Sequence, residues 1–313
     1  MGTVFNVVLP VFAIILCGFL SAHYRLLGPE STEALNRFVY YIALPVMLFH
    51  SMASVETTTI FNWPYISAYA AGQMVTFVLA LLVARVVFGL RLAEGGLFSM
   101  NSIWGNTGYM GIPLAIVAFG PEGGLPAIIA TVYQTIVIIG IVAVMIEVDI
   151  SKRADALGMI GDVCRGLVTN PLIVAPVLGL LFSMSGLTLL EPIDTFARIV
   201  SPAAGPCALF ALGMFLVGKP LSQGASEVSG MVLIKLIIQP VITWWFVFHV
   251  FDMDPTWGAI AVLMAALPMG ATGFVMAQKY GIYIQRTSSA TLVSTVLAVV
   301  SVSVLFLMAF MQP

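Results

Sequence analysis

Two stretches of this sequence place helix breakers in the middle of apolar segments. Residues 101–119 read NSIWGNTGYMGIPLAIVAF, and residues 264–280 read MAALPMGATGFVMAQKY. Glycine and proline at this density should unwind a helix, because glycine is conformationally free and proline lacks an amide donor. Unwound backbone at membrane depth is tolerated only where protein or a watery cavity satisfies its amides. The two stretches therefore predict a pair of helix breaks and a candidate binding site.

The composition is that of a protein whose solvent is the lipid bilayer. The 313 residues are 60% hydrophobic and 8% charged, with a mean hydropathy of +1.07. Soluble domains are about half apolar and a quarter charged. We expect an all-α polytopic membrane protein of about ten transmembrane helices, because a helix of about 20 apolar residues crosses the bilayer. We do not expect a removable signal peptide. The segments are residues 3–22, 34–54, 63–88, 97–119, 125–147, 167–185, 192–217, 229–251, 256–280 and 286–311.

The two halves of the chain resemble each other. Gly105–Tyr109 and Gly270–Phe274 share the pattern G-x-T-G-aromatic at an offset of 165. Ten spans give five in each half. Because five is an odd number, the second half must enter the membrane from the opposite face. This predicts a 5+5 inverted repeat, with repeats in residues 1–150 and 167–313 and a cytoplasmic linker at 151–166. At an offset of 161 the aligned pairs are Pro10 with Pro171, Gly18 with Gly179, Glu30 with Glu191, Arg37 with Arg198, Pro45 with Pro206, Leu48 with Leu209 and Phe49 with Phe210.

Basic residues gather on one side of the predicted membrane. The exception, Arg198, lies four residues after Asp194, which can neutralise it as a helix pair. By the positive-inside rule the basic side is cytoplasmic, so the N-terminus and the C-terminus are both expected outside. The basic side holds Arg25, Arg37, Arg85, Arg91, Lys152, Arg153, Arg165, Lys219, Lys235, Lys279 and Arg286.

The acidic residues argue against ion translocation. All 14 Asp and Glu residues fall in predicted loops or near helix ends, whereas ion-translocating proteins usually carry carboxylates at mid-membrane. Lys235 lies about two turns inside its segment, and we expect its side chain to snorkel to the interface rather than to contact a substrate.

The predicted breaks suit an anionic ligand. New half-helices present free N–H groups and the positive end of a dipole, which bind carboxylates without a buried cation. Pro113 suits the first position of such a half-helix. The alternative is that these glycines serve close helix packing and that Asn106 is an interhelical donor; matching clusters in both halves favour the binding site. Its candidate residues are Asn106, Thr107, Gly108, Pro113, Pro268, Ala271, Thr272 and Gly273.

Two other functional classes compete with a carrier. A membrane receptor could bind a small ligand at the same site without moving it. A membrane enzyme would need convergent nucleophile and base residues, which the predicted spans do not offer. The sequence has no nucleotide-binding loop or zinc motif, and its cysteines, at positions 17, 164 and 207, are scattered. We expect no catalytic residue, metal, cofactor or nucleic-acid partner.

The motifs as a group resemble the auxin efflux carrier family, which includes plant PIN-FORMED auxin carriers and bacterial malonate transporters. Residues 234–240, IKLIIQP, with Trp244 are most similar to the malonate-transporter branch. The motifs that carry the resemblance are Asn36-Arg37-Phe38-Val39 with Pro45 and Phe49-His50, Asn106-Thr107 with Met110-Gly111-Ile112-Pro113-Leu114, Asn170-Pro171, and Ala266-Leu267-Pro268 with Phe274 and Tyr280-Gly281.

This resemblance implies two crossed broken helices, in segments four and nine, and an elevator-type carrier in a bacterial inner membrane. Segments 1, 2, 6 and 7 would form a scaffold and a homodimer contact, and segments 3–5 and 8–10 a mobile transport domain. The substrate, a malonate-like dicarboxylate or auxin-like monocarboxylate, would contact Asn106 and Gln134. The chain departs from the plant pattern at Ala271 and Thr272, where no second asparagine stands, and at Ala70, Ala71 and Gln73, where plant relatives carry an acid.

The charge asymmetry predicts which loops a reagent can reach from outside. Cysteines introduced after Trp63 or Gly123 should react with a membrane-impermeant thiol reagent in intact cells. Cysteines at Arg91 or Ala156 should react only after permeabilisation, because the basic loops stay in the cytoplasm. Labelling at position 156 in intact cells would reverse the assigned orientation.

Overall fold

The computed structural model describes residues 2–54, 61–150, 168–169, 171–215, 217–218 and 224–310. The expected linker at 151–166 lies outside this part of the chain. Within the described residues the regular secondary structure is helical. Outside the helices, Gly105 and Met269 form an isolated antiparallel backbone bridge. The predicted all-α fold is therefore confirmed for these residues. The helices long and apolar enough to cross a membrane are Trp63–Val86, Pro121–Ile150, Glu191–Phe215, Ala225–Val250 and Ile284–Leu307.

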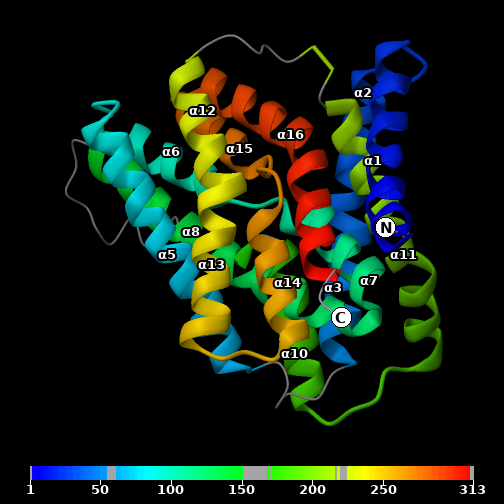
Figure 1. The fold of residues 1–313 in the computed structure, drawn as a ribbon. Coiled ribbons are helices and arrows are strands. Elements are labelled where there is room, and N and C mark those ends of the chain that lie inside the picture. Colours follow the sequence, from blue (N-terminus) through cyan, green and yellow to red (C-terminus); the bar gives the residue numbers. More distant parts are fainter. Residues whose placement is uncertain are drawn as a thin grey trace. The chain divides into compact units, whose positions relative to one another are not determined.

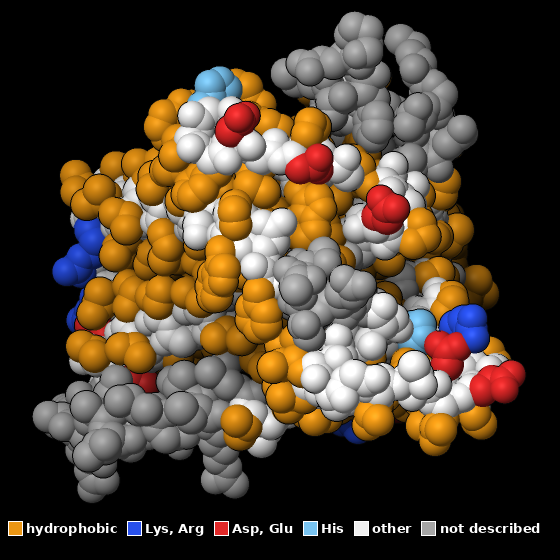
Figure 2. Space-filling model, turned by 90° about the horizontal axis from the view of Figure 1, so that it is seen from below, with side chains coloured by type: hydrophobic (Ala, Val, Ile, Leu, Met, Phe, Trp, Pro, Cys, Tyr) orange, Lys and Arg blue, Asp and Glu red, His pale blue; other side chains and the backbone are white. Residues whose placement is uncertain are grey.

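The surface carries the apolar character expected of an integral membrane protein. On the face drawn in Figure 2, hydrophobic side chains predominate and charged ones are few. Along the helix α5 (Trp63–Val86), the side chains of Val75, Val78 and Leu82 are all about half exposed. Residues three and four apart lie on one helix face, so these three form an exposed apolar stripe. Such a stripe fits contact with lipid.

The helices fall into two compact units, which are described separately (Figure 1). Unit 1 comprises Met1–Trp63, Gly108–Val132 and Gly166–Gly218; unit 2 comprises Pro64–Thr107, Tyr133–Arg165 and Lys219–Pro313.

Unit 1 is built mainly from two helix pairs. Helix α1 packs along α11, and α3 packs along α10. The helical elements of unit 1 are α1 (Gly2–His23), α2 (Pro29–Phe38), the π turn η1 (Val39–Ala43), α3 (Leu44–Ala53), α7 (Ile112–Phe119), the short turn η3 (Pro121–Gly123), the first part of α8 (Gly124–Ile150), α10 (Pro171–Met184) and α11 (Glu191–Phe215).

Two glycines of unit 1 make equivalent close contacts. A Cβ on Gly18 in α1 would overlap the carbonyl oxygen of Phe210 in α11, and one on Gly179 in α10 would lie 2.5 Å from the carbonyl oxygen of Phe49 in α3. The offset of 161 that relates Gly18 to Gly179 also relates Phe49 to Phe210. The same backbone-to-backbone approach thus occurs twice, which supports a structural repeat.

Unit 2 contains both helix breaks. Helix α13 packs on α14, α12 packs on α6 and α16, and α14 and α15 pack on α16. The helical elements of unit 2 are α5, α6 (Leu92–Ile103), the last part of α8, α12 (Ala225–Leu233), the π turn η4 (Ile234–Ile238), α13 (Gln239–Trp245), the π turn η5 (Phe246–Val250), α14 (Pro255–Ala266), α15 (Thr272–Tyr280) and α16 (Ile284–Phe310).

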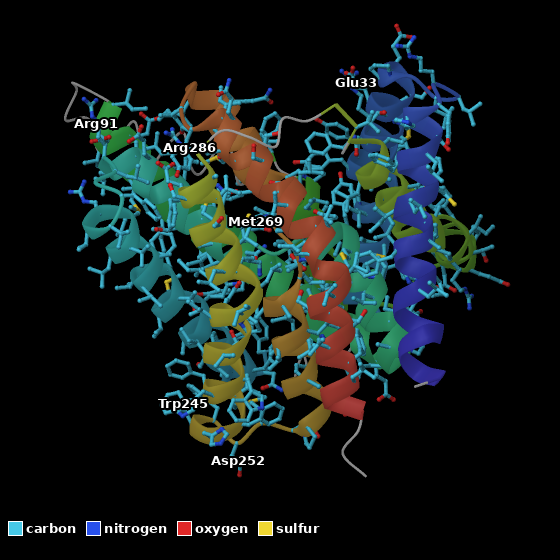
Figure 3. The ribbon with its side chains drawn as sticks, turned by 45° about the horizontal axis from the view of Figure 1, so that its top comes forward. Glu33, Arg91, Trp245, Asp252, Met269 and Arg286 are labelled. Carbon is cyan, nitrogen blue, oxygen red and sulfur yellow. The ribbon has the colours of Figure 1, made fainter. Side chains whose placement is uncertain are left out.

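The charged residues labelled in unit 2 lie at its two ends. Figure 3 places Arg91 and Arg286 at one end and Trp245 and Asp252 at the other, with Met269 between them. Arg91 precedes α6 and Arg286 lies in the first turn of α16, and the charge pattern assigns both to the same side of the membrane. This arrangement fits the predicted sidedness of unit 2.

An ion-pair cluster joins α12 to the start of α16 at the Arg286 end. Arg286 Nε lies 2.5 Å from Glu227 Oε2, and the Tyr283 hydroxyl donates to the same oxygen at 2.7 Å. Burial and the bond to Glu227 raise the pKa of Tyr283. The phenol therefore remains a hydrogen-bond donor at physiological pH.

The first predicted break lies between α6 and α7. Helix α6 ends at Ile103, and helical backbone resumes at Thr107 with the π turn η2 (Thr107–Gly111), which leads directly into α7. The expectation that Pro113 starts the new half-helix was wrong, because Pro113 is the second residue of α7 and η2 precedes it. The π turn begins at the threonine of the G-x-T-G pattern.

The second predicted break lies between α14 and α15. Helix α14 is capped by Asp254, whose carboxylate accepts hydrogen bonds from the amides of Thr256 and Trp257, and the helix ends at Ala266. Leu267 has an extended conformation, φ −61° and ψ 151°, as expected for a residue that precedes proline. Pro268 therefore terminates the helix rather than kinking it.

Candidate functional site

The two breaks of unit 2 are joined through their backbones. The amide of Asn106 donates to the carbonyl of Pro268 at 2.8 Å, and the amide of Gly270 donates to the carbonyl of Trp104 at 3.0 Å. These bonds flank the bridge between Gly105 and Met269. They satisfy peptide groups that the interrupted helices leave without partners. The unwound segments can therefore remain buried together.

Glycine is required where the two backbones meet. A Cβ on Gly105 would lie 2.9 Å from the carbonyl oxygen of Met264, and one on Gly270 would lie 2.8 Å from Trp104 Cδ1. Both distances are shorter than ordinary van der Waals contacts. Alanine at either position would therefore push the breaks apart.

Gln134, in α8, binds both sides of the Gly105 backbone. Its Oε1 accepts the Gly105 amide at 3.2 Å, and its Nε2 donates to the Gly105 carbonyl at 3.0 Å and, weakly, to Thr107 Oγ1 at 3.5 Å. Gln73 Nε2 donates to Gln134 Oε1 at 3.2 Å and to the Tyr69 hydroxyl at 2.8 Å. The fully buried Gln134 thus supports the first break, and in this arrangement its amide is saturated.

A serine hydroxyl supports the second break. Ser294 Oγ, in α16, accepts the amide of Met269 at 3.1 Å. Ser294 lies 160 residues after Gln134, close to the offsets of 161 and 165 that align the two halves of the sequence. Each break is therefore hydrogen-bonded by a side chain from the helix that follows it in the sequence.

The expectation that Lys235 snorkels to the interface was wrong. Its exposed fraction is 0%, and its Nζ donates to Gln239 Oε1 at 2.6 Å and to the carbonyl of Ala265 at 2.5 Å. Gln239 Nε2 in turn donates to the carbonyl of Ile103 at 3.0 Å. Those carbonyls lie at the ends of α14 and α6, so they attract the ammonium inward. The only sequence signal was the four-residue spacing of Lys235 and Gln239.

Unit 2 holds most of the predicted substrate-binding residues, whereas Gly108 and Pro113 belong to unit 1. Asn106 is 7% exposed, and its side-chain amide makes no hydrogen bond to another described residue. Ala271 precedes α15 without a side-chain cap, and the amides of Thr272 and Gly273, which begin the helix, have no acceptor within it. The predicted residues in unit 2 are Asn106, Thr107, Gln134, Pro268, Ala271, Thr272 and Gly273.

Asn101 faces α15 and was missed by the sequence reasoning. A Cβ on Gly273 would overlap the Oδ1 atom of Asn101. Asn101 Nδ2 donates to the carbonyl of Leu97 at 2.7 Å, while Oδ1 is buried and has no partner among the described residues. Asn101 lies in the regular part of α6, so the search for helix breakers did not find it.

Metal-binding geometry is not found in the described part of the chain. Its His, Cys, Asp and Glu residues form no group of three or more that could hold an ion. The described cysteines, Cys17 and Cys207, are free thiols. The site chemistry in unit 2 is therefore that of amides, hydroxyls, backbone groups and one ammonium.

A family model described as "Membrane transport protein" matches residues 3–306. The chain belongs to this family. A "Putative malonate transporter" of Rhizobium meliloti (strain 1021) is 28% identical over 304 residues, covering 97% of this chain and 95% of the relative. "Auxin efflux carrier component 8" of Arabidopsis thaliana is 20% identical over 355 residues, covering 94% of each chain. "Lysosomal cholesterol signaling protein" of Mus musculus is 23% identical over 257 residues, covering 76% of this chain and 29% of the relative.

These similarities confirm the resemblance to the auxin efflux carrier family. The family consists of membrane transport proteins rather than enzymes, so its members act on a small-molecule substrate in a lipid environment. The paired breaks of unit 2 therefore lie in an integral membrane protein of a transporter family.

The bridge between the breaks can be tested with two glycine substitutions in unit 2. Gly105→Ala should lower the free energy of unfolding by about 1–3 kcal/mol, because the new methyl group presses on the carbonyl of Met264. Gly140→Ala is the control, since nothing lies within 4 Å of its Cβ position in α8. Thermal unfolding in detergent measures both. Equal unfolding temperatures for the two variants would contradict the close approach.

Proposed function

We propose that this protein is a secondary transporter of a small organic anion, either a malonate-like dicarboxylate or an auxin-like monocarboxylate. The observation that carries the proposal is the backbone pairing of two broken helices in unit 2, next to the uncapped start of α15. Broken helices whose half-helix N-termini face anionic groups are the usual substrate sites of transporters with inverted repeats. The named relatives from Rhizobium meliloti and Arabidopsis thaliana support the substrate class.

The polar groups around the second break suit a carboxylate. The amides of Thr272 and Gly273 at the start of α15 and the side chain of Asn106 supply hydrogen-bond donors, and the helix dipole favours a negative charge at that end. Thr107, Thr272 and Gly273 complete the proposed contacts in unit 2, with Gln134 holding the backbone in place. Acids do not compete for these donors, because the described carboxylates of unit 2 come from the ends of its helices. They are Glu94, Glu147, Asp149, Glu227, Asp252 and Asp254.

The proposed mechanism is alternating access of the elevator type. In this mechanism a transport domain of segments 3–5 and 8–10 moves past a scaffold of segments 1, 2, 6 and 7, through which two copies form a dimer. The repeated glycine contact of unit 1 supports the inverted repeat that such exchange needs. Both termini would lie outside a bacterial inner membrane, on the basis of the basic-residue asymmetry.

A second candidate function is ligand sensing without transport. The mouse relative whose name refers to signaling supports this alternative, although the chain covers only 29% of its length. Saturable ligand binding without flux into proteoliposomes would favour the receptor, whereas accumulation of labelled ligand would favour the carrier.

Asn106 provides a test of the proposed contact. Asn106→Ala should weaken anion binding roughly ten-fold or more, because a hydrogen bond to a charged group contributes about 1.5–3 kcal/mol. Thr76→Val is a matched control, since the Thr76 hydroxyl bonds the carbonyl of Gly72 in its own helix. Calorimetric titration with malonate gives both affinities. Unchanged affinity in a well-folded Asn106→Ala protein would assign this residue to packing alone.

The absence of predicted mid-membrane acids leads to a prediction about energy coupling. Uptake of a charged carboxylate should not require sodium and should respond to voltage, because 100 mV acts on each net charge with about 2.3 kcal/mol. Proteoliposome uptake is measured at fixed pH with sodium or choline, under potassium–valinomycin potentials of either sign. A strict sodium requirement would refute this coupling, and flux indifferent to voltage would show that no net charge crosses.

A further inference from the structure

Lys235 is a fully buried ammonium that the proposed anion contacts do not use. Both of its hydrogen-bond acceptors, Gln239 Oε1 and the Ala265 carbonyl, are formally neutral oxygens. Among the described residues no carboxylate forms an ion pair with it. A buried charge without compensation is strongly unfavourable. A charged Lys235 therefore needs compensation from groups other than an acid.

The ends of two helices supply the compensation. The carbonyl of Ala265 belongs to the last turn of α14 and has no helical partner. Ile103 is the last residue of α6, and its carbonyl is bound by Gln239, which also binds the ammonium. Each helix C-terminus carries about half a negative charge. The two C-termini together therefore offset about one positive charge.

The oxygens around this ammonium are of the kind that binds small metal cations. Main-chain carbonyls at the ends of broken helices and amide oxygens are ligands for hard monovalent and divalent ions. The Met264 carbonyl and the ammonium both border the Cβ position of Gly105, at 2.9 Å for Met264 O and 3.4 Å for Lys235 Nζ. The ammonium thus occupies a position where these oxygens could otherwise coordinate a metal cation.

We propose that Lys235 is a tethered cation that fills a monovalent-cation site between the C-termini of α6 and α14. The covalently attached charge stabilises the pair of broken helices, so unit 2 needs no metal ion at this point. Shortening the side chain should uncover a latent site for a small monovalent cation. This inference concerns the support of the breaks and does not depend on which anion the protein carries.

Two substitutions distinguish the effect of losing the positive charge from the effect of losing side-chain volume. Lys235→Ala removes the ammonium and leaves room, whereas Lys235→Met removes it and fills the same volume. Thermal unfolding of each purified full-length protein is measured in sodium, methylammonium and N-methylglucamine chlorides at constant ionic strength. The last cation is too bulky for the space and serves as the salt control.

The wild-type protein should unfold at the same temperature in all three salts. Lys235→Ala should unfold at a lower temperature in N-methylglucamine and recover by several degrees, saturably, as sodium or methylammonium is added, because a ligand stabilises the state that binds it. Lys235→Met should be destabilised without recovery. Thermal unfolding is measured without substrate, so a negative result in the anion-binding assay would not affect this test.

The proposal is overturned if Lys235→Ala responds no more than Lys235→Met, or if Lys235→Met is as stable as the wild type. A lysine that served the substrate instead would give variants that lose anion affinity without any cation response. Where Lys235→Ala does not accumulate, Lys235→Gln takes its place, because its shorter side chain keeps an amide donor and leaves part of the volume of the lysine side chain empty. The same recovery is expected, and its absence decides against the tethered cation.

Discussion

The hydrogen bonds between the two helix breaks are the interaction on which unit 2 depends. Lipid cannot pair with a free peptide group, so an unwound segment at membrane depth must find partners in protein. Asn106 with Pro268 and Gly270 with Trp104 provide them. Because these contacts join backbones directly, the residues at their centre must be small. The glycines, the amide of Gln134 and the hydroxyl of Ser294 are consequences of this one requirement.

The opposite ends of the broken helices have different surroundings. The C-termini of α6 and α14 meet the ammonium and amide of Lys235 and Gln239, whereas the start of α15 has no side-chain cap. A helix end that is already neutralised attracts no further charge, while an uncapped N-terminus still favours an anion. The same pair of breaks can therefore hold a fixed positive charge at one side and offer donors to a negative one at the other.

The sequence predicted the features that local chemistry determines. Clustered glycine and proline located both breaks, and the extended residue before Pro268 follows from proline sterics. Lys235 was misjudged because its acceptors, Ala265 and Ile103, are remote in sequence and become neighbours only in the folded unit. Asn101 was missed for a similar reason, since its neighbour Gly273 is remote in sequence. Pro113 was misplaced because a π turn can start ahead of a proline.

The two breaks pair through their backbones but are supported by different side chains. Gln134 binds both the amide and the carbonyl of Gly105, whereas Ser294 makes one bond to the amide of Met269. The second break thus receives fewer bonds from the helix that follows it. The ammonium of Lys235 binds the end of α14, which leads into that break. The ammonium, costly to bury by itself, thus adds a hydrogen bond at the break that receives fewer bonds from the helix after it.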